Sequence, residues 1–178
     1  FAAEFVAVDA ETLTLTPDNL SDVEAATLPC AGLTAWRALF VEAQLGPGDT
    51  ILVEGSGGVS LFALQLARIA GADVVAVTST AEKVEKLRAL GATHVLNYRE
   101  QPEWGRDVVR LTGGRGVDYV VEVVGGDLTQ AMTALRLGGR ALLIGALSRQ
   151  PIAFRSLMAI AGNRSVIGLT VASRADQE

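Results

Sequence analysis

The residues best able to support chemistry form a glycine-rich turn, Gly55-Ser56-Gly57-Gly58-Val59-Ser60. A short apolar run, Thr50–Glu54, precedes it, and a segment with helical periodicity follows. The first glycine permits a tight turn, and Gly57 lets the backbone approach a pyrophosphate without a Cβ in the way. The amides and dipole of a helix N-terminus favour the negative charge of such a group. Glycines also serve purely structural turns, but this strand–turn–helix context favours a nucleotide site.

Hydroxyl and cationic side chains follow the next apolar run, Asp73–Thr78. NAD enzymes usually place a carboxylate here to bond the ribose hydroxyls, whereas this chain has Thr78 and Ser79. Hydroxyls can donate to a 2′-phosphate that a carboxylate would repel, and Lys83 could add positive charge from the next helical turn. Ser79 could instead cap a helix, with Glu82 as its capping-box partner, and Lys83 could be a solvated surface residue. The pattern favours NADP(H) over NAD(H).

Other reactive side chains are sparse. The single cysteine, Cys30, and the single histidine, His94, cannot form a disulfide or a structural zinc site. No acid–base constellation is evident, so the catalytic residues stay unassigned. We expect His94, Asp118 and Glu122 to have structural roles, and Glu122, inside a strand, is the one of most interest.

Short apolar runs rich in β-branched residues alternate with segments of helical pattern. Such continuously hydrophobic strands are typical of a parallel sheet covered on both faces. Their alternation with helices predicts a doubly wound α/β (Rossmann) fold with strand order 3-2-1-4-5-6. The expected strands are Thr50–Glu54, Asp73–Thr78, His94–Asn97, Val117–Val124, Arg140–Ile144 and Ser165–Val171. The expected helices are Val59–Ala70, Ala81–Leu90, Trp104–Leu111, Leu128–Leu135 and Phe154–Ala161.

The first 48 residues follow a different pattern. Glu4–Val8 is predicted to be a strand and Leu13–Leu20 an irregular polar stretch. A helix is expected from about Thr34 to Ala43, with Thr34 as its N-cap.

Composition excludes several classes of protein. The net charge is −5 with charges of both signs interspersed, which argues against a nucleic-acid partner. No apolar run approaches the ~20 residues needed to span a bilayer, and no signal-peptide pattern is visible. We therefore expect a cytoplasmic protein that acts on a small molecule and does not bind a membrane.

Several motifs resemble those of the medium-chain dehydrogenase/reductase superfamily, especially its zinc-type alcohol dehydrogenase-like and quinone oxidoreductase branches. They are Thr27–Trp36, the glycine turn, Ala89–Tyr98, Gly113–Asp118 and Gly138–Arg140, in the family's order. The resemblance implies a two-domain enzyme that transfers a hydride between NAD(P)H and a carbonyl, a quinone or an activated alkene.

The resemblance also implies roles for particular residues. Thr34 would approach the nicotinamide, and Thr78, Ser79, Lys83 and Tyr98 would surround the adenosine phosphate. The cofactor would also be lined at the ends of the fourth and fifth strands by Val124, Gly125, Ile144, Gly145 and Ala146.

The resemblance implies, further, that the chain is a piece of a longer enzyme and is inactive by itself. Residues 1–33 would be the tail of a GroES-like catalytic domain, and residues 34–178 the Rossmann domain. Cys30 could be one of three zinc ligands in a full-length zinc enzyme, but no zinc is expected in this chain. The edge strand 165–171 would pair in a homodimer.

Two other functions compete with this interpretation. Val53-Glu54-Gly55-Ser56-Gly57-Gly58 also resembles the acidic, glycine-rich loop of S-adenosylmethionine-dependent methyltransferases, although Thr78 stands where those enzymes need a carboxylate. A non-catalytic NADPH-binding module is the other alternative. The oxidoreductase interpretation accounts for more of the motifs.

Overall fold

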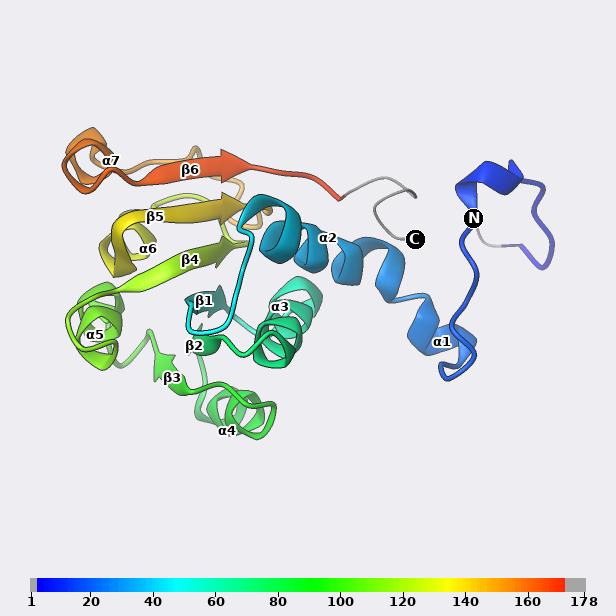
Figure 1. Cartoon of the computed structure of the whole chain (residues 1–178), viewed down its shortest axis with the longest axis horizontal. Helices are drawn as coiled ribbons and strands as arrows, with labels where there is room; N and C mark the ends of the chain where they lie inside the picture. Colours follow the sequence, from blue (N-terminus) through cyan, green and yellow to red (C-terminus); the bar gives the residue numbers. More distant parts are fainter. Residues whose placement is uncertain (1–2, 172–178) are drawn as a thin grey trace.

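A computed structural model describes residues 3–171 and contains one parallel six-stranded sheet (Figure 1). Its strand order, β3-β2-β1-β4-β5-β6, confirms the predicted Rossmann topology. The strands are β1 (Thr50–Glu54), β2 (Asp73–Thr78), β3 (His94–Asn97), β4 (Val117–Glu122), β5 (Leu135–Leu143) and β6 (Ser165–Gly168). All five neighbouring pairs are parallel, so the carboxyl ends of the strands lie along one edge of the sheet.

Helices cover both faces of this sheet (Figure 1). One face packs against α3 (Gly58–Ile69), α4 (Ala81–Ala89) and a continuous helical run. That run comprises α2 (Leu33–Trp36) between two π-helical segments, η2 (Leu28–Gly32) and η3 (Arg37–Glu42). The other face packs against α5 (Trp104–Leu111), α6 (Thr129–Ala134) and α7 (Ser156–Gly162). Two short helices, η1 (Ala10–Thr12) and α1 (Asp22–Ala25), precede η2 in the chain.

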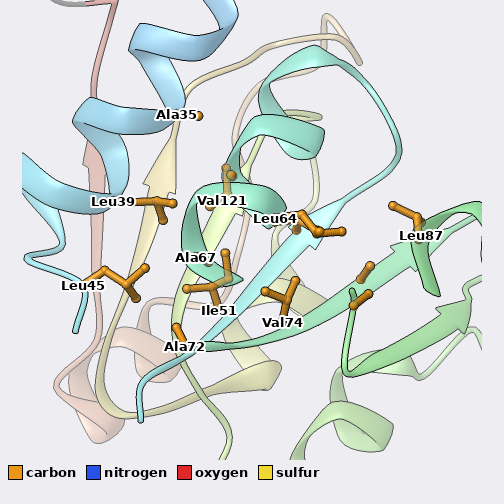
Figure 2. Close-up of a cluster of buried hydrophobic side chains, with 14 residues drawn as sticks. Ala35, Leu39, Leu45, Ile51, Leu64, Ala67, Ala72, Val74, Leu87 and Val121 are labelled. Carbon is orange, nitrogen blue, oxygen red and sulfur yellow. The ribbon is translucent and has the colours of Figure 1, made fainter. Parts of the chain in front are cut away.

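Successive side chains point to opposite sides of the sheet, and because helices cover both sides, the strands are buried on both faces. Ile51 and Val53 of β1 join the cluster beneath α3, whereas Leu52 joins the cluster beneath α5 and α6. Figure 2 shows the first cluster, in which Leu39 and Leu64 approach β1 and β2 from the helical side. This two-sided burial explains why the strands are continuously hydrophobic in sequence.

A buried ionic cluster lies near the amino ends of the central strands. Asp118 of β4 is fully buried, and its carboxylate accepts hydrogen bonds from the guanidinium of Arg115 at 2.6 and 2.8 Å. It also accepts from Arg136 Nε at 2.5 Å and from the Thr50 amide at 2.8 Å. The cluster therefore joins β1, β4 and the start of β5. This arrangement agrees with the structural role expected for Asp118.

Several predicted boundaries were wrong. Glu4–Val8 forms no strand, since it has no neighbouring strand to pair with and its side chains are exposed. Thr34 is not an N-cap, because the helical run begins at Leu28 and Thr34 lies buried inside it. β5 starts at Leu135 rather than at Arg140, and its register with β4 shifts between Leu135 and Arg140. β6 ends at Gly168, short of Val171.

Two further points concern the described residues and membrane-spanning helices. The outer ends of the two expected domains, residues 1–2 and 172–178, lie outside the described residues. Within residues 3–171, no helix combines the length and the apolar character that a membrane crossing requires.

Candidate functional site

The glycine turn joins the end of β1 to the start of α3. Gly55 adopts a positive φ of 72°, and its amide donates to the Val77 carbonyl of β2 at 2.7 Å. Ser60 fits where a third glycine is common because its hydroxyl, buried in the first turn of α3, donates to the Glu54 carbonyl at 2.6 Å. Gly57 is the N-cap of α3, and no side chain caps this helix. The first amides of α3 are therefore left for another partner.

The space beside this turn is open. A Cβ added to Gly57 would meet no protein atom within 4 Å, and the same holds at Gly55. Gly57 has φ −80° and ψ 170°, a conformation that any residue can adopt. Neither strain nor protein packing therefore requires glycine at position 57, whereas a Cβ at Gly58 would lie only 3.1 Å from Ala31 Cβ.

A pocket of about 430 Å³ opens at the carboxyl ends of the central strands, beside the glycine turn. It brings together many of the residues named from the sequence: Gly55, Thr78, Ser79, Lys83, Tyr98, Val124 and Gly125. It is also lined by residues that sequence reasoning did not assign to the site: Glu54, Val77, Trp104, Glu122 and Asp127. Residues at or just beyond the ends of four strands meet in one cavity because parallel strands end at the same edge of the sheet.

Two of the buried residues that line this pocket carry carboxyl groups. Glu54 ends β1 and Glu122 ends β4, and their residues are only 7% and 2% exposed. Burial, the negative charge of Glu122 and a hydrogen bond between the two carboxyls raise the pKa of Glu54 well above its usual range. Glu122 Oε1 accepts hydrogen bonds from the amides of Val124 and Gly125, both at 2.8 Å. The structural role expected for Glu122 is thus to hold the turn after β4, within the pocket wall.

The pKa of Glu54 predicts an unusual pH dependence of stability. Native Glu54 keeps its proton above pH 4.5, where the unfolded chain releases it. The native state then binds more protons, so this group lowers stability as pH rises. We expect Glu54→Gln to raise the free energy of unfolding by about 1–3 kcal/mol at pH 8 and to leave it unchanged at pH 4. Urea unfolding at both pH values measures this, and a destabilised variant at pH 8 would contradict it.

The hydroxyl and lysine side chains after β2 differ in their environments. Thr78 is buried and its Oγ1 has no hydrogen-bond partner among the described residues. The predicted capping box of Ser79 and Glu82 was wrong, because Thr80 is the N-cap and accepts from the Lys83 amide. Ser79 is therefore not occupied in capping, and Glu82 pairs with Lys86 at 2.6 Å instead. Lys83 forms no salt bridge within residues 3–171.

The other residues named from the sequence lie outside this pocket. Val59 packs on the core beneath α3, and Ile144 packs there as well. The segment Ile144-Gly145-Ala146 lies against the turn after β4, where a Cβ on Gly125 would be 3.3 Å from Ala146 Cα. Thr34 is buried in the helical run and does not line the pocket. Ser56, Gly57 and Gly58 form the adjoining turn.

A signal for Glu54 was present in the sequence. It is a charged residue at the last position of an otherwise apolar strand, directly before the glycine turn. A carboxyl buried at such a position needs a partner, and this requirement points to the pocket.

The described residues do not supply a zinc site. Cys30 is exposed, and no group of three or more His, Cys, Asp or Glu side chains within residues 3–171 could hold a metal ion. A catalytic zinc needs three protein ligands. Residues 3–171 by themselves therefore do not fit a catalytic zinc.

Comparison with known proteins places this geometry in a family. A family model described as zinc-binding dehydrogenase matches residues 58–178. The chain belongs to this family. The chain is thus a nucleotide-binding segment of the medium-chain dehydrogenase/reductase superfamily, which confirms the resemblance found in the sequence.

Individual zinc-binding dehydrogenase relatives agree with this. A zinc-type alcohol dehydrogenase-like protein of Schizosaccharomyces pombe is 44% identical over 146 residues, which are 80% of this chain and 42% of that protein. A solved NAD-dependent alcohol dehydrogenase is 35% identical, with a TM-score of 0.87 over 98% of this chain and 51% of its own. A quinone oxidoreductase of Pseudomonas syringae pv. Tomato DC3000 is 27% identical, with a TM-score of 0.79 over 87% and 48%. The chain thus spans about half the length of these relatives.

Proposed function

We propose that this chain is the NADP(H)-binding part of an oxidoreductase that transfers a hydride between NADPH and a carbonyl, a quinone or an activated alkene. The observation that carries the proposal is the uncapped N-terminus of α3, with its open glycine turn, beside a pocket whose wall includes Ser79 and Lys83. Membership of the family supports an oxidoreductase and removes the methyltransferase alternative. A full-length protein that oxidises NADPH with an electrophile would exclude the non-catalytic module.

The glycine turn would bind the pyrophosphate. The free amides at the start of α3 and the helix dipole favour its negative charge. Because a Cβ at Gly57 would occupy open space, the absence of one leaves that space to a ligand. Val124 and Gly125, at the end of β4, would form the facing wall for the adenosine half.

The preference for NADPH has to come from this chain's own residues, since one solved relative is an NAD-dependent enzyme. No carboxylate ends β2, where Thr78 and Ser79 stand instead. Ser79 has a hydroxyl that is free of capping, and the Lys83 ammonium lies in the same pocket wall with no salt bridge to any described residue. Hydroxyl and ammonium donors suit a 2′-phosphate.

The dihydronicotinamide, when bound, supplies the hydride, and the chain's own part is to bind and orient the cofactor. Thr34 and the Ile144–Ala146 segment are the residues we propose to lie toward the nicotinamide half. Orientation of the reacting atoms and exclusion of water contribute much of such catalysis.

The test of this proposal is a titration with NADPH and NADH by calorimetry. We expect Lys83→Ala to weaken NADPH binding about five- to tenfold, the effect of one exposed charge on a phosphate, and to leave NADH binding unchanged. Lys86→Ala is the matched control, since Lys86 lies on the same helix but pairs with Glu82. Equal binding of both cofactors by the unmodified chain would contradict the NADPH preference.

We also propose that residues 1–33 belong with a catalytic domain, as the family resemblance implies. The apolar side chains of Phe5 and Leu15 are 90% and 98% exposed, and residues 3–25 stand apart from the sheet (Figure 1). Val6, Val8 and Leu13 are exposed in the same segment, and exposed apolar residues that occur together are typical of a surface that contacts other protein. Residues 28–32, at the end of this segment, pack against α3.

A homodimer through β6 is the partner we propose. β6 is the outer strand of the sheet, so one side of its backbone faces no other strand of the described sheet. Sedimentation equilibrium should give twice the monomer mass of 18.6 kDa. A single monomeric species at high concentration would contradict the proposed pairing.

A further inference from the structure

Glu54 and Glu122 are side chains that a dinucleotide site of this kind does not obviously need. They end the two central strands, β1 and β4, which are hydrogen-bonded neighbours. Both line the pocket, and both are more than nine-tenths buried. Two carboxyl groups placed so close together in a buried setting cannot both be ionised without large cost.

The hydrogen bonding of the two groups differs. Glu122 Oε1 accepts two backbone hydrogen bonds, which suits a carboxylate. Glu54 Oε2 is buried and no donor in residues 3–171 reaches it. A carboxylate can only accept hydrogen bonds, so an ionised Glu54 would leave this oxygen unsatisfied. A neutral Glu54 has a proton of its own and can donate it to Glu122.

The two hydrogen bonds to Glu122 set the shape of the pocket wall. They come from consecutive amides, those of Val124 and Gly125, and so fix the turn directly after β4. The conformation of this turn is also restricted on its other side, because Gly125 has φ 73° and packs against the Gly145–Ala146 segment. A displacement of the Glu122 carboxylate would therefore move the wall that faces the nucleotide.

We propose that Glu54 is a positioning residue that carries a proton shared with Glu122, and that this proton keeps the Val124–Gly125 turn in the conformation that accepts the dinucleotide. This inference rests on the proposed function for the identity of the ligand. When Glu54 releases its proton to solvent, the two carboxylates repel each other and the turn loses its fixed acceptor. Dinucleotide binding then weakens as pH rises.

Other ionisable groups from the surrounding elements line the same pocket. Lys83 comes from α4, Tyr98 follows β3 and Asp127 follows β4. The Asp127 carboxylate is occupied by the Thr129 amide at 2.9 Å. No lysine or arginine within residues 3–171 forms a salt bridge with either glutamate. Within residues 3–171 the pair therefore has no salt-bridged cation that would favour its doubly ionised form.

The test is the dissociation constant of NADPH between pH 5.5 and 9 for the 178-residue chain, Glu54→Gln and Glu85→Gln. The side-chain amide introduced by Glu54→Gln donates to Glu122 at every pH, so this variant should keep its affinity at high pH. The NADPH affinity of the unmodified chain should fall by about tenfold or more over the same range. Glu85, an exposed residue paired with Arg88, is the control and should follow the unmodified chain. The 2′-phosphate titrates at about pH 6 and affects all three proteins alike. Parallel profiles for the unmodified chain and Glu54→Gln would overturn the proposal.

A second measurement needs no cofactor. The amide resonances of Val124 and Gly125 should shift with pH in the unmodified chain and stay constant in Glu54→Gln. Absence of such a titration overturns the proposal even if NADPH binds. If no dinucleotide binds at any pH, the proposed function and the role in binding are refuted together. The amide shifts then decide whether the proton-sharing pair exists.

Discussion

Asp118→Ala should lower the free energy of unfolding by about 3 kcal/mol, because it removes the central member of a buried ionic cluster. The substitution leaves the guanidinium groups of Arg115 and Arg136 and the Thr50 amide without their acceptor. Both guanidinium groups are partly exposed and can recover water, which places the effect at the lower end for a broken buried pair. Urea denaturation monitored by circular dichroism measures it.

The control for Asp118→Ala is Glu85→Ala. Glu85 and Arg88 form an exposed pair on α4, so the loss should stay below about 0.5 kcal/mol. Equal effects of the two substitutions would contradict the role given to the buried cluster.

The same cluster predicts how the chain responds to acid. Burial alone would raise the pKa of Asp118, but hydrogen bonds from Arg115, Arg136 and the Thr50 amide outweigh it and lower the pKa. A lowered native pKa gives stability that is present above pH 3.8, the ordinary value, and is lost as pH falls through the native pKa. Asp118→Asn should therefore show a flatter loss of stability between pH 5 and pH 2. A slope equal to that of the unmodified chain would exclude this contribution.

Gly57→Ala should weaken NADPH binding by at least about tenfold and leave the free energy of unfolding within about 0.5 kcal/mol of its original value. The backbone at Gly57 suits alanine, and the added Cβ meets no protein atom within 4 Å. Only a ligand in that space would meet the methyl group. Calorimetric titration and urea unfolding on the same sample separate the two effects.

Gly46→Ala is the matched control for Gly57→Ala. Gly46 lies before β1, and a Cβ there also meets nothing within 4 Å. It should change neither binding nor stability appreciably. Destabilisation by Gly57→Ala with unchanged NADPH affinity would show that the glycine serves the turn alone.

Much of the fold could be predicted because its main signal is local. Strands such as Val74–Val77 are buried on both faces, and this requires a run of apolar residues that is visible without any structure. The errors occurred where tertiary contacts decide. The β-branched pattern of Glu4–Val8 found no partner strand, and the helical run extended back to Leu28 because residues 28–32 pack on α3. Ser79 and Thr80 are both hydroxyl residues, so sequence alone did not distinguish the true N-cap.

The candidate site was predicted in part for a similar reason. Residues at the carboxyl ends of parallel strands must gather at one edge, which brought Thr78, Tyr98 and Val124 into one pocket. Glu54 was missed because a strand pattern does not tell which terminal residue turns inward. Its pairing with Glu122 depends on β1 and β4 being neighbours, although 68 residues separate their ends.

The central claim is that a nicotinamide dinucleotide binds across the glycine turn and the pocket at the carboxyl ends of the central strands. The most direct measurement is a two-dimensional NMR titration of the isotope-labelled chain with NADPH. We expect saturable shifts of the amides of Gly55–Val59, Thr78–Lys83 and Val124–Gly125, and little change in β6 or α7. Saturable shifts confined to another face, or none at millimolar NADPH, would contradict the claim.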